Sequence, residues 1–246
     1  MSPWLRPLRA DARIRLFCFP YAGGGVAEFA RWRLRLPSDI EVLPLSLPGR
    51  EGRHAEAPHR RVETLAAAIS AGIGPAIDRP WAVYGHSMGA AVGFAVASLL
   101  CSAGHRPPEH LFFGARGGPG GTRTASPVHH LPEDDFLAAL QLRYQAIPAA
   151  LLADRALLSL FLPSLRADME IAETAALEGY APVPAPATVF LGRDDGTATP
   201  EDAARWAAWV GSPFTVKSLE GGHFFLKGPN PHLLDGIAAG LGTAAG

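Results

Sequence analysis

Short apolar runs alternate with amphipathic segments along most of the chain. Continuous or alternating apolar runs that end at Gly or Pro are typical of β-strands, and apolar residues recurring every three to four positions are typical of helices. A strand, a helix and a further strand in succession form a parallel pair with a right-handed crossover. We therefore expect an α/β protein with a mostly parallel central sheet flanked by helices. The predicted strands are Ile14–Phe19, Ile40–Leu45, the residues before Gly85, His110–Gly114, Ala187–Leu191 and Phe214–Leu219, and the predicted helices Val62–Ile77, Met88–Ala103, Pro200–Val210 and Pro231–Leu241.

This alternation is interrupted between Arg116 and Pro186, where no convincing strand signal occurs. The segment is too long for a simple connection, so it is either a second small domain or a helical lid inserted into the sheet domain. Its apolar side chains either pack on one another or line an acyl pocket. We expect one domain over residues 1–246, with a helical lid insertion at about residues 125–180. The helices predicted there are Pro132–Arg143, Ala149–Leu162 and Leu165–Leu177, with apolar faces at Phe136, Leu137, Leu140, Leu157, Leu160 and Phe161.

The segment Val83–Ala91 contains the pattern G-x-S-x-G between a strand signal and an Ala-rich helix signal. That context predicts a nucleophile elbow, a tight turn that exposes Ser87 at the start of a helix. Gly85 and Gly89 lack the Cβ atoms that would collide where strand and helix come close. The backbone N–H of Met88 and the helix dipole would stabilise an oxyanion on a carbonyl attacked by Ser87.

A second glycine-rich loop, Pro20–Gly25, follows the first predicted strand. One interpretation is a phosphate-binding loop, but no lysine follows and the glycine spacing differs from the known nucleotide-binding patterns. The other is the loop that supplies a second oxyanion donor in serine hydrolases. This interpretation assigns the donor to the N–H of Ala22.

Serine is a poor nucleophile at neutral pH and needs a histidine base that a carboxylate holds in the right tautomer. In α/β-hydrolases the chain order is serine, acid, histidine, with the acid after a late strand and the base after the last one. His223 follows the final predicted strand, and Asp194 and Asp195 follow the strand before it. These residues fit the expected order, with the acid being one of the two aspartates.

Other histidines are weaker candidates for the base. His86 neighbours the serine, but adjacent residues at a sharp turn point in different directions, so we assign it a structural role. His129 and His130 resemble a metal-binding pair, yet no carboxylate or cysteine lies at useful helical spacing before Pro132. We expect them to lie in a solvated loop.

Composition narrows the function classes. The chain has 246 residues, 48% of them hydrophobic and 18% charged, with a formal net charge of −1. No global basic field exists to attract nucleic acid, which is not an expected partner. Cys18 and Cys101 lie in apolar patterns and are expected to be free thiols in a reducing compartment. No secretory signal or run long enough to span a bilayer is present, so we expect a cytoplasmic protein with no membrane partner.

Five segments carry a family resemblance that covers nearly the whole chain. They are Phe17–Gly24, Leu47–Glu51, Gly85–Gly89, Leu165–Asp168 and Gly221–Phe225. Together they resemble the type II thioesterases of polyketide and nonribosomal peptide pathways, members of the α/β-hydrolase superfamily. The elbow alone would fit any hydrolase, whereas the first glycine-rich loop and the Gly-Gly-His-Phe-Phe segment are much more specific.

The resemblance implies an α/β-hydrolase fold and a serine thioesterase that needs no cofactor and no metal. Its substrates would be acyl or aminoacyl groups stranded on the phosphopantetheine arm of an acyl carrier or peptidyl carrier protein, which the enzyme removes in an editing role. Implied as catalytic triad are Ser87, Asp195 and His223, with Ala22 and Met88 as oxyanion donors. In this family the acid commonly lies three residues after the glycine that ends the strand, which favours Asp195 over Asp194.

Departures from the family pattern lie mostly in the expected lid. The loop Ala115–Gly121 is unusually rich in glycine, and Tyr144–Pro148 replaces a Gly-Gly-Thr-Pro-like turn. Because the lid shapes the acyl pocket in this family, the sequence leaves the chain-length preference open. A carrier protein with an acidic recognition helix would need a basic rim beside the serine. The candidates for that rim are Arg50, Arg53, Arg60 and Arg61.

Two other functions compete with carrier-bound thioester hydrolysis. One is a general esterase or acyltransferase acting on small free substrates, which would act far better on free esters than on carrier-bound thioesters. The other is a non-catalytic protein that uses the fold to hold an acyl chain or a synthase partner. A complete set of triad residue types argues against this second alternative.

Overall fold

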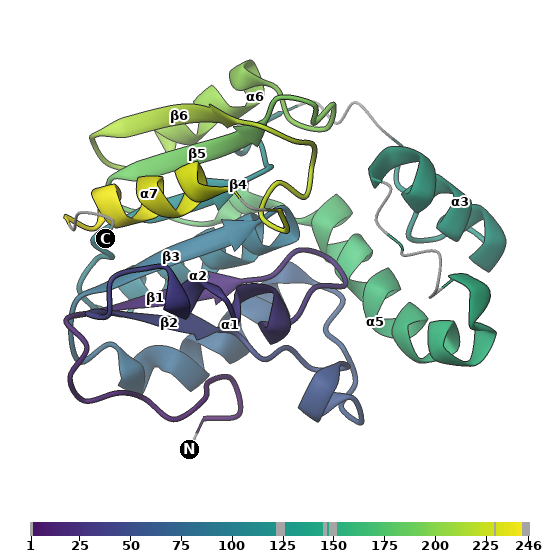
Figure 1. Ribbon diagram of the computed structural model, residues 1–246, viewed down its shortest axis with the longest axis horizontal. Helices are drawn as coiled ribbons and strands as arrows, with labels where there is room; N and C mark the ends of the chain where they lie inside the picture. The colour runs from purple at the N-terminus through teal and green to yellow at the C-terminus, as the bar shows by residue number, and fades with distance from the viewer. Residues whose placement is uncertain (1, 122–125, 145–146, 148–151, 229, 243–246) are drawn as a thin grey trace.

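The computed structural model describes residues 2–121, 126–144, 147, 152–228 and 230–242. Its centre is a six-stranded sheet in the order β2-β1-β3-β4-β5-β6, in which every pairing between described strands is parallel. Figure 1 shows this twisted sheet with helices on its faces. The mostly parallel α/β sheet expected from the sequence is confirmed. The strands are β1 (Ile14–Phe19), β2 (Ile40–Pro44), β3 (Trp81–His86), β4 (Leu111–Gly114), β5 (Ala187–Gly192) and β6 (Phe214–Leu219).

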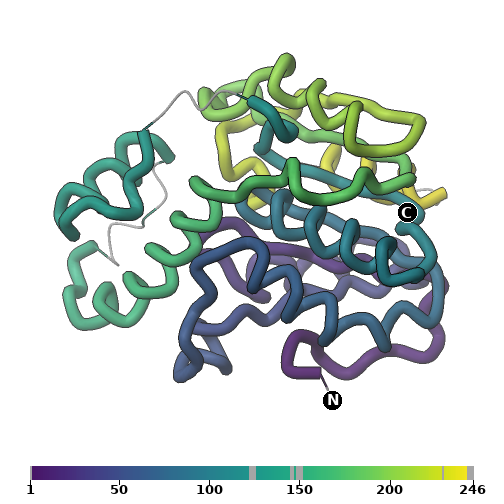
Figure 2. The backbone as a smooth tube through the Cα atoms, turned by 180° about the vertical axis from the view of Figure 1, so that it is seen from behind, coloured from purple at the N-terminus to yellow at the C-terminus, as the bar shows by residue number. Residues whose placement is uncertain are grey.

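Helices cover both faces of the sheet. The strands are therefore buried on both sides, except for β6 at the edge. Helices α1 (Val62–Ile73) and α2 (Met88–Ser102) pack on one face with Phe17 and Val83. Helix α7 (Pro231–Gly240) packs on the other face. Figure 1 shows α7 in front of the sheet, and Figure 2, from behind, shows α2 across the opposite face. Shorter helical segments are η1 (Val26–Phe29), η2 (Trp32–Leu34), η3 (Glu51–Arg53), η4 (Gly74–Ala76), η5 (Leu177–Gly179), α6 (Pro200–Ala204) and η6 (Arg205–Ala208).

Two longer helices, α3 (Glu133–Tyr144) and α5 (Arg155–Thr174), lie between β4 and β5 in the chain and are called the inserted helices below. They extend from one side of the sheet (Figures 1 and 2). The two separate helices predicted on either side of Pro163 are wrong, because α5 runs through this proline without a break. A proline removes one backbone donor and bends a helix at a cost of about 3 kcal/mol. Burial of Leu158, Leu162 and Met169 on the same helix offsets that cost.

The apolar residues of the inserted helices divide into a packed group and an exposed group. Phe136, Leu137 and Leu140 of α3 form a small core with Leu158, Leu162 and Met169 of α5. The predicted partners on α5 are not part of that core. They remain exposed, at 42% for Leu157, 72% for Leu160 and 40% for Phe161.

Cys18 is buried and Cys101 is partly buried, and both are free thiols. No helix in the described part of the chain is long and apolar enough to cross a membrane.

Candidate active site

Ser87 occupies the turn between β3 and α2, with φ of 55° and ψ of −114°. L-residues rarely adopt this positive φ, so the surrounding backbone must hold the turn in place. A Cβ atom at Gly85 would lie 2.2 Å from the carbonyl oxygen of Gly89, and one at Gly89 would lie 2.1 Å from the carbonyl oxygen of Phe19. The two glycines are therefore required for the close approach of strand and helix that exposes the serine.

His223 lies between Ser87 and Asp195 and forms a hydrogen bond with each. Its Nε2 is 3.0 Å from Ser87 Oγ, and its Nδ1 is 2.9 Å from Asp195 Oδ2. The three residues follow the carboxyl ends of β3, β5 and β6, which meet at one edge of a parallel sheet. The side chains of His223 and Asp195 are only 8% and 1% exposed, so solvent competes little for their hydrogen bond.

Of the two aspartates after β5, the structure brings Asp195 and not Asp194 to the imidazole. Burial raises the pKa of Asp195, but hydrogen bonds from His223 and Thr197 more than reverse this and leave it below its usual value. Thr197, which sequence reasoning missed, has its Oγ1 2.6 Å from Asp195 Oδ1 and 2.9 Å from His223 Nδ1. The available signal was an aspartate two residues before a threonine, a spacing typical of Asx turns.

His86 is buried beneath the site and holds the loop that carries His223. Its Nε2 lies 2.7 Å from the backbone carbonyl of His223, and its Nδ1 lies 3.0 Å from the Tyr84 hydroxyl. Burial lowers the pKa of His86 to about 3, so the ring is neutral near pH 7. A carbonyl only accepts, so Nε2 carries the proton and Nδ1 accepts from Tyr84. The ring therefore cannot also serve as the base for Ser87.

The loop at the end of β1 lies beside the elbow and presents Ala22. Gly24 N–H donates to the Tyr21 carbonyl at 2.9 Å, which closes a tight turn. No hydrogen bond among the described residues occupies the Ala22 N–H. Met88 is the first residue of α2, where backbone donors have no intrahelical partner. Both N–H groups are thus available in the way an oxyanion hole requires.

Arg50 and Asp168 form a buried ion pair against this loop. Arg50 Nη1 and Nη2 donate to the two carboxylate oxygens at 2.6 and 2.7 Å, and Nη1 also donates to the Gly24 carbonyl at 2.9 Å. Asp168 Oδ2 accepts from the Gly23 N–H at 2.8 Å. The expectation of Arg50 in a basic rim is therefore wrong, since both terminal nitrogens of its guanidinium bind Asp168 inside the protein.

The other arginines proposed for the rim are also paired with carboxylates. Arg53 packs on the Trp4 ring at 4.4 Å and binds Glu56. Arg60 and Arg61 are exposed and lie next to Glu170 and Glu63.

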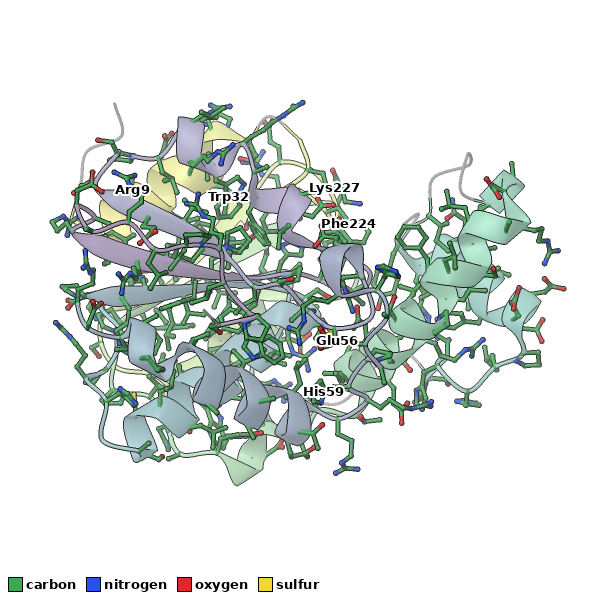
Figure 3. All side chains as sticks on the ribbon, turned by 90° about the horizontal axis from the view of Figure 1, so that it is seen from below. Arg9, Trp32, Glu56, His59, Phe224 and Lys227 are labelled. Carbon is green, nitrogen blue, oxygen red and sulfur yellow. The ribbon has the colours of Figure 1, made fainter. Side chains whose placement is uncertain are left out.

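Lys227, which the sequence did not single out, is closer to the site. Its Nζ lies 4.5 Å from the centre of the Phe224 ring, whose own centre is 5.0 Å from that of His223. Figure 3 shows Lys227 and Phe224 side by side.

A cavity of about 490 Å³ opens onto Ser87 and His223. The glycine-rich loop 115–121 forms one wall, and the inserted helices contribute Tyr144 from α3 and Met169 from α5. The Tyr144 ring lies 4.8 Å from that of His223. Arg116, Arg143 and Glu173 also line the cavity, so its wall is partly polar. The neighbouring residues 145, 146 and 148 of the unusual turn lie outside the described residues.

No group of three or more His, Cys, Asp or Glu side chains in the described ranges is arranged to hold a metal ion. His129 is not in a solvated loop as expected. Its Nδ1 lies 2.6 Å from Glu173 Oε2, and the same carboxylate accepts from the Val128 N–H at 2.9 Å. The sequence hid this contact because the partners are 44 residues apart.

The model of the thioesterase domain family matches residues 14–240. The chain belongs to this family. The thioesterase is 35% identical to gramicidin S biosynthesis protein GrsT of Aneurinibacillus migulanus over 219 residues. The match covers 89% of this chain and 85% of that protein. It is 33% identical over 235 residues to thioesterase PikA5 of Streptomyces venezuelae, covering 91% and 80% of the two chains.

Solved structures similar to this thioesterase have the same α/β-hydrolase fold. RedJ, a thioesterase from the prodiginine biosynthetic pathway in Streptomyces coelicolor, superposes with a TM-score of 0.85 at 32% identity, covering 96% of this chain and 91% of the other. BorB, a type II thioesterase from the borrelidin biosynthetic cluster, gives 0.84 at 31% identity, covering 99% and 98%. The resemblance stated from the sequence motifs is confirmed.

Proposed function

We propose that this thioesterase hydrolyses acyl thioesters held on the phosphopantetheine arm of acyl carrier or peptidyl carrier proteins, and so clears stranded acyl groups in polyketide or nonribosomal peptide synthesis. The observation that carries the proposal is the pair of hydrogen bonds from His223, one to Ser87 Oγ and one to Asp195. The relatives from such pathways support the choice of substrate class. Two free thiols favour a reducing compartment, so we place the enzyme in the cytoplasm.

In the proposed reaction His223 Nε2 takes the proton of Ser87 as Oγ attacks the thioester carbonyl. The N–H groups of Ala22 and Met88 bind the oxyanion that forms. Collapse of this intermediate breaks the carbon–sulfur bond, and His223 returns the proton to the leaving pantetheine thiol. His223 then deprotonates a water molecule, which attacks the acyl-enzyme, and returns that proton to Ser87 Oγ as the ester bond breaks and the acid leaves. Asp195 holds Nδ1–H and stabilises the imidazolium in both halves.

The experiment that tests this function is mass spectrometry of carrier proteins loaded with a panel of acyl groups, before and after incubation with the enzyme. We expect conversion to free-thiol carrier with wild type, and a loss of several orders of magnitude with Ser87→Ala, as in other triad knockouts. Ser159→Ala, an exposed serine on α5, is the matched control and should keep full activity. Free ester hydrolysis far above carrier hydrolysis would instead indicate a general esterase.

We propose further that Lys227 contributes to carrier binding. It is exposed and lies beside Phe224 at the edge of the site, whereas the four arginines considered earlier are paired. Lys227→Glu should raise the apparent KM for an acidic carrier at low salt and have less effect at high salt. The control is Lys217→Glu, a change at the chain's other lysine on strand β6. Equal effects of the two changes would remove Lys227 from the interface.

A further inference from the structure

We propose that Arg50 and Asp168 are positioning residues that hold the Tyr21–Gly25 loop so that the N–H of Ala22 faces the reacting carbonyl. This inference rests on the proposed function, since it concerns the oxyanion hole of that reaction. It also accounts for two motif segments, Leu47–Glu51 and Leu165–Asp168, that the triad leaves unused.

The contacts of the pair fall on the backbone on the C-terminal side of Ala22. Asp168 accepts from the Gly23 N–H at 2.8 Å, which belongs to the same peptide plane as the Ala22 carbonyl. Arg50 donates to the Gly24 carbonyl at 2.9 Å. Gly23 has a φ of 79°, a conformation that costs glycine little and that these bonds select. Two consecutive residues of the loop are thus fixed by one bidentate ion pair.

Burial of the pair argues that stability alone does not explain it. The side chains of Arg50 and Asp168 are 6% and 3% exposed, and Arg50 Nε has no partner among the described atoms. Taking two charges out of water is unfavourable, and apolar residues of similar size often stabilise a protein as well or better. An unsatisfied buried donor lowers the stability further. What the ion pair does provide is a Tyr21–Gly25 loop held in one conformation beside Ser87.

The residue after Arg50 holds the far end of the same loop. Glu51 accepts from the Val26 N–H at 3.1 Å, at the start of η1. A Cβ at Gly25 would lie 2.5 Å from the Glu51 carboxylate, so the contact needs glycine there. Neighbouring residues Arg50 and Glu51 therefore anchor the loop on both sides of Gly25.

The test measures the reactivity of Ser87 per folded molecule. A fluorophosphonate probe phosphonylates Ser87, and its P=O oxygen occupies the oxyanion hole as the carbonyl would. The variants are Asp168→Asn, which keeps the size and loses the charge, and Arg50→Lys, which keeps the charge and loses the bidentate fork. We expect each to lower the second-order labelling rate about 10- to 100-fold, below the 10²- to 10³-fold cost of deleting an oxyanion donor outright. Hydrolysis of p-nitrophenyl acetate should show the loss in kcat, with KM nearly unchanged.

Glu41→Gln is the matched control. Glu41 is a buried carboxylate that, like Asp168, accepts from an arginine and a backbone N–H, here Arg15 Nε at 3.1 Å and Arg9 N–H at 2.7 Å. It lies at the other end of the strands from Ser87. This variant should lose stability and keep its labelling rate.

Labelling rates of Asp168→Asn and Arg50→Lys that match Glu41→Gln would overturn the positioning role and leave only a structural one. If Asp168→Asn does not fold, Arg50→Lys decides the question. The probe needs no carrier protein, so its result distinguishes failure of the positioning role from failure of the proposed function. A wild type that labels rapidly and fails to hydrolyse carrier thioesters would refute that function and leave the positioning role standing.

Discussion

Two adjacent carboxylates follow β5, and the Asp195 side chain contacts His223. Asp194 uses its backbone N–H to bind the Gly221 carbonyl at 3.1 Å, and the residue is exposed. Asp195→Asn should stabilise the wrong imidazole tautomer and lower kcat by up to about 10⁴. Asp194→Asn should cost far less. Steady-state kinetics of both variants on one acyl carrier substrate checks the order, and the reverse order would move the acid one residue back.

His86 carries a second prediction for single residues. Because its Nε2–H fixes the carbonyl of His223, His86→Ala should let the catalytic loop shift and lower kcat by about 10-fold or more. His86→Gln places an amide nitrogen near the position of Nε2 and should recover part of the loss. The pH profile of kcat should keep its shape, since a neutral His86 takes no part in proton transfer. A changed profile would contradict this role.

The residues that the sequence proposed as a triad, and that the structure brings together, are those marked by a local pattern. Ser87 lies in a five-residue motif, and His223 and Asp195 follow strands in a known chain order. Arg50 and Asp168 are 118 residues apart, and neither has a local pattern that names its partner. The buried ion pair forms only when the segments that carry Arg50 and Asp168 meet the Tyr21–Gly25 loop in the folded chain. Family motifs marked both segments as notable without indicating what they do.

Among the elements, α3 and the part of α5 before Pro163 are predicted to act as a mobile lid. They leave Leu157 and Leu160 exposed, whereas α2 is buried along nearly its whole length. Segments with few buried contacts open at low free energy. Amide hydrogen exchange should therefore be at least about 10-fold faster in α3 and residues 155–162 than in α2. Protection equal to that of α2, together with an acyl preference that ignores substitutions in α3, would contradict the gating role.

Element boundaries were predictable where the local signal and the packing agree. Strands β1 and β6 have the bounds that the apolar pattern predicts. Pro20 follows β1 directly, and the apolar pattern of β6 stops just before Glu220 and Gly221. Helix α5 differs, since a proline is a local signal for a break and tertiary packing overrides it. Its exposed residues were likewise misassigned because the helix turns a different face toward α3 than the pattern suggested.

For the whole molecule, buried histidines predict loss of stability in acid. Burial lowers the pKa of His86 to about 3 and that of His110 to about 4, against 6.5 for the unfolded chain. Between pH 6.5 and about 4 the unfolded chain binds protons that the native state does not. The free energy of unfolding should fall as pH falls through this window, by up to about 1.4 kcal/mol per pH unit for each histidine.

Denaturant unfolding at several pH values checks this prediction. His110 stacks on Phe112 at 4.3 Å and forms a hydrogen bond with Thr188 Oγ1 at 2.9 Å. His110→Gln should weaken the pH dependence without removing it, because His86 remains. Identical slopes in wild type and His110→Gln would contradict the assignment.

Pro163 divides α5 into two parts with different attachments, and this division bears on how acyl preference can change. Met169, Ala172 and Glu173 line the cavity at Ser87, and all three lie beyond Pro163, next to the clamped Asp168. That wall is anchored to the oxyanion loop, so enlarging it by substitution also disturbs the catalytic geometry. Arg143 and Tyr144, at the end of α3, line the same cavity and are also tied to its surroundings. Arg143 Nη1 lies 3.7 Å from Glu173 Oε1, and the Tyr144 ring lies 4.8 Å from that of His223. Engineering for longer or more polar acyl groups on either helix therefore has to follow the rate of the chemistry together with the width of the cavity.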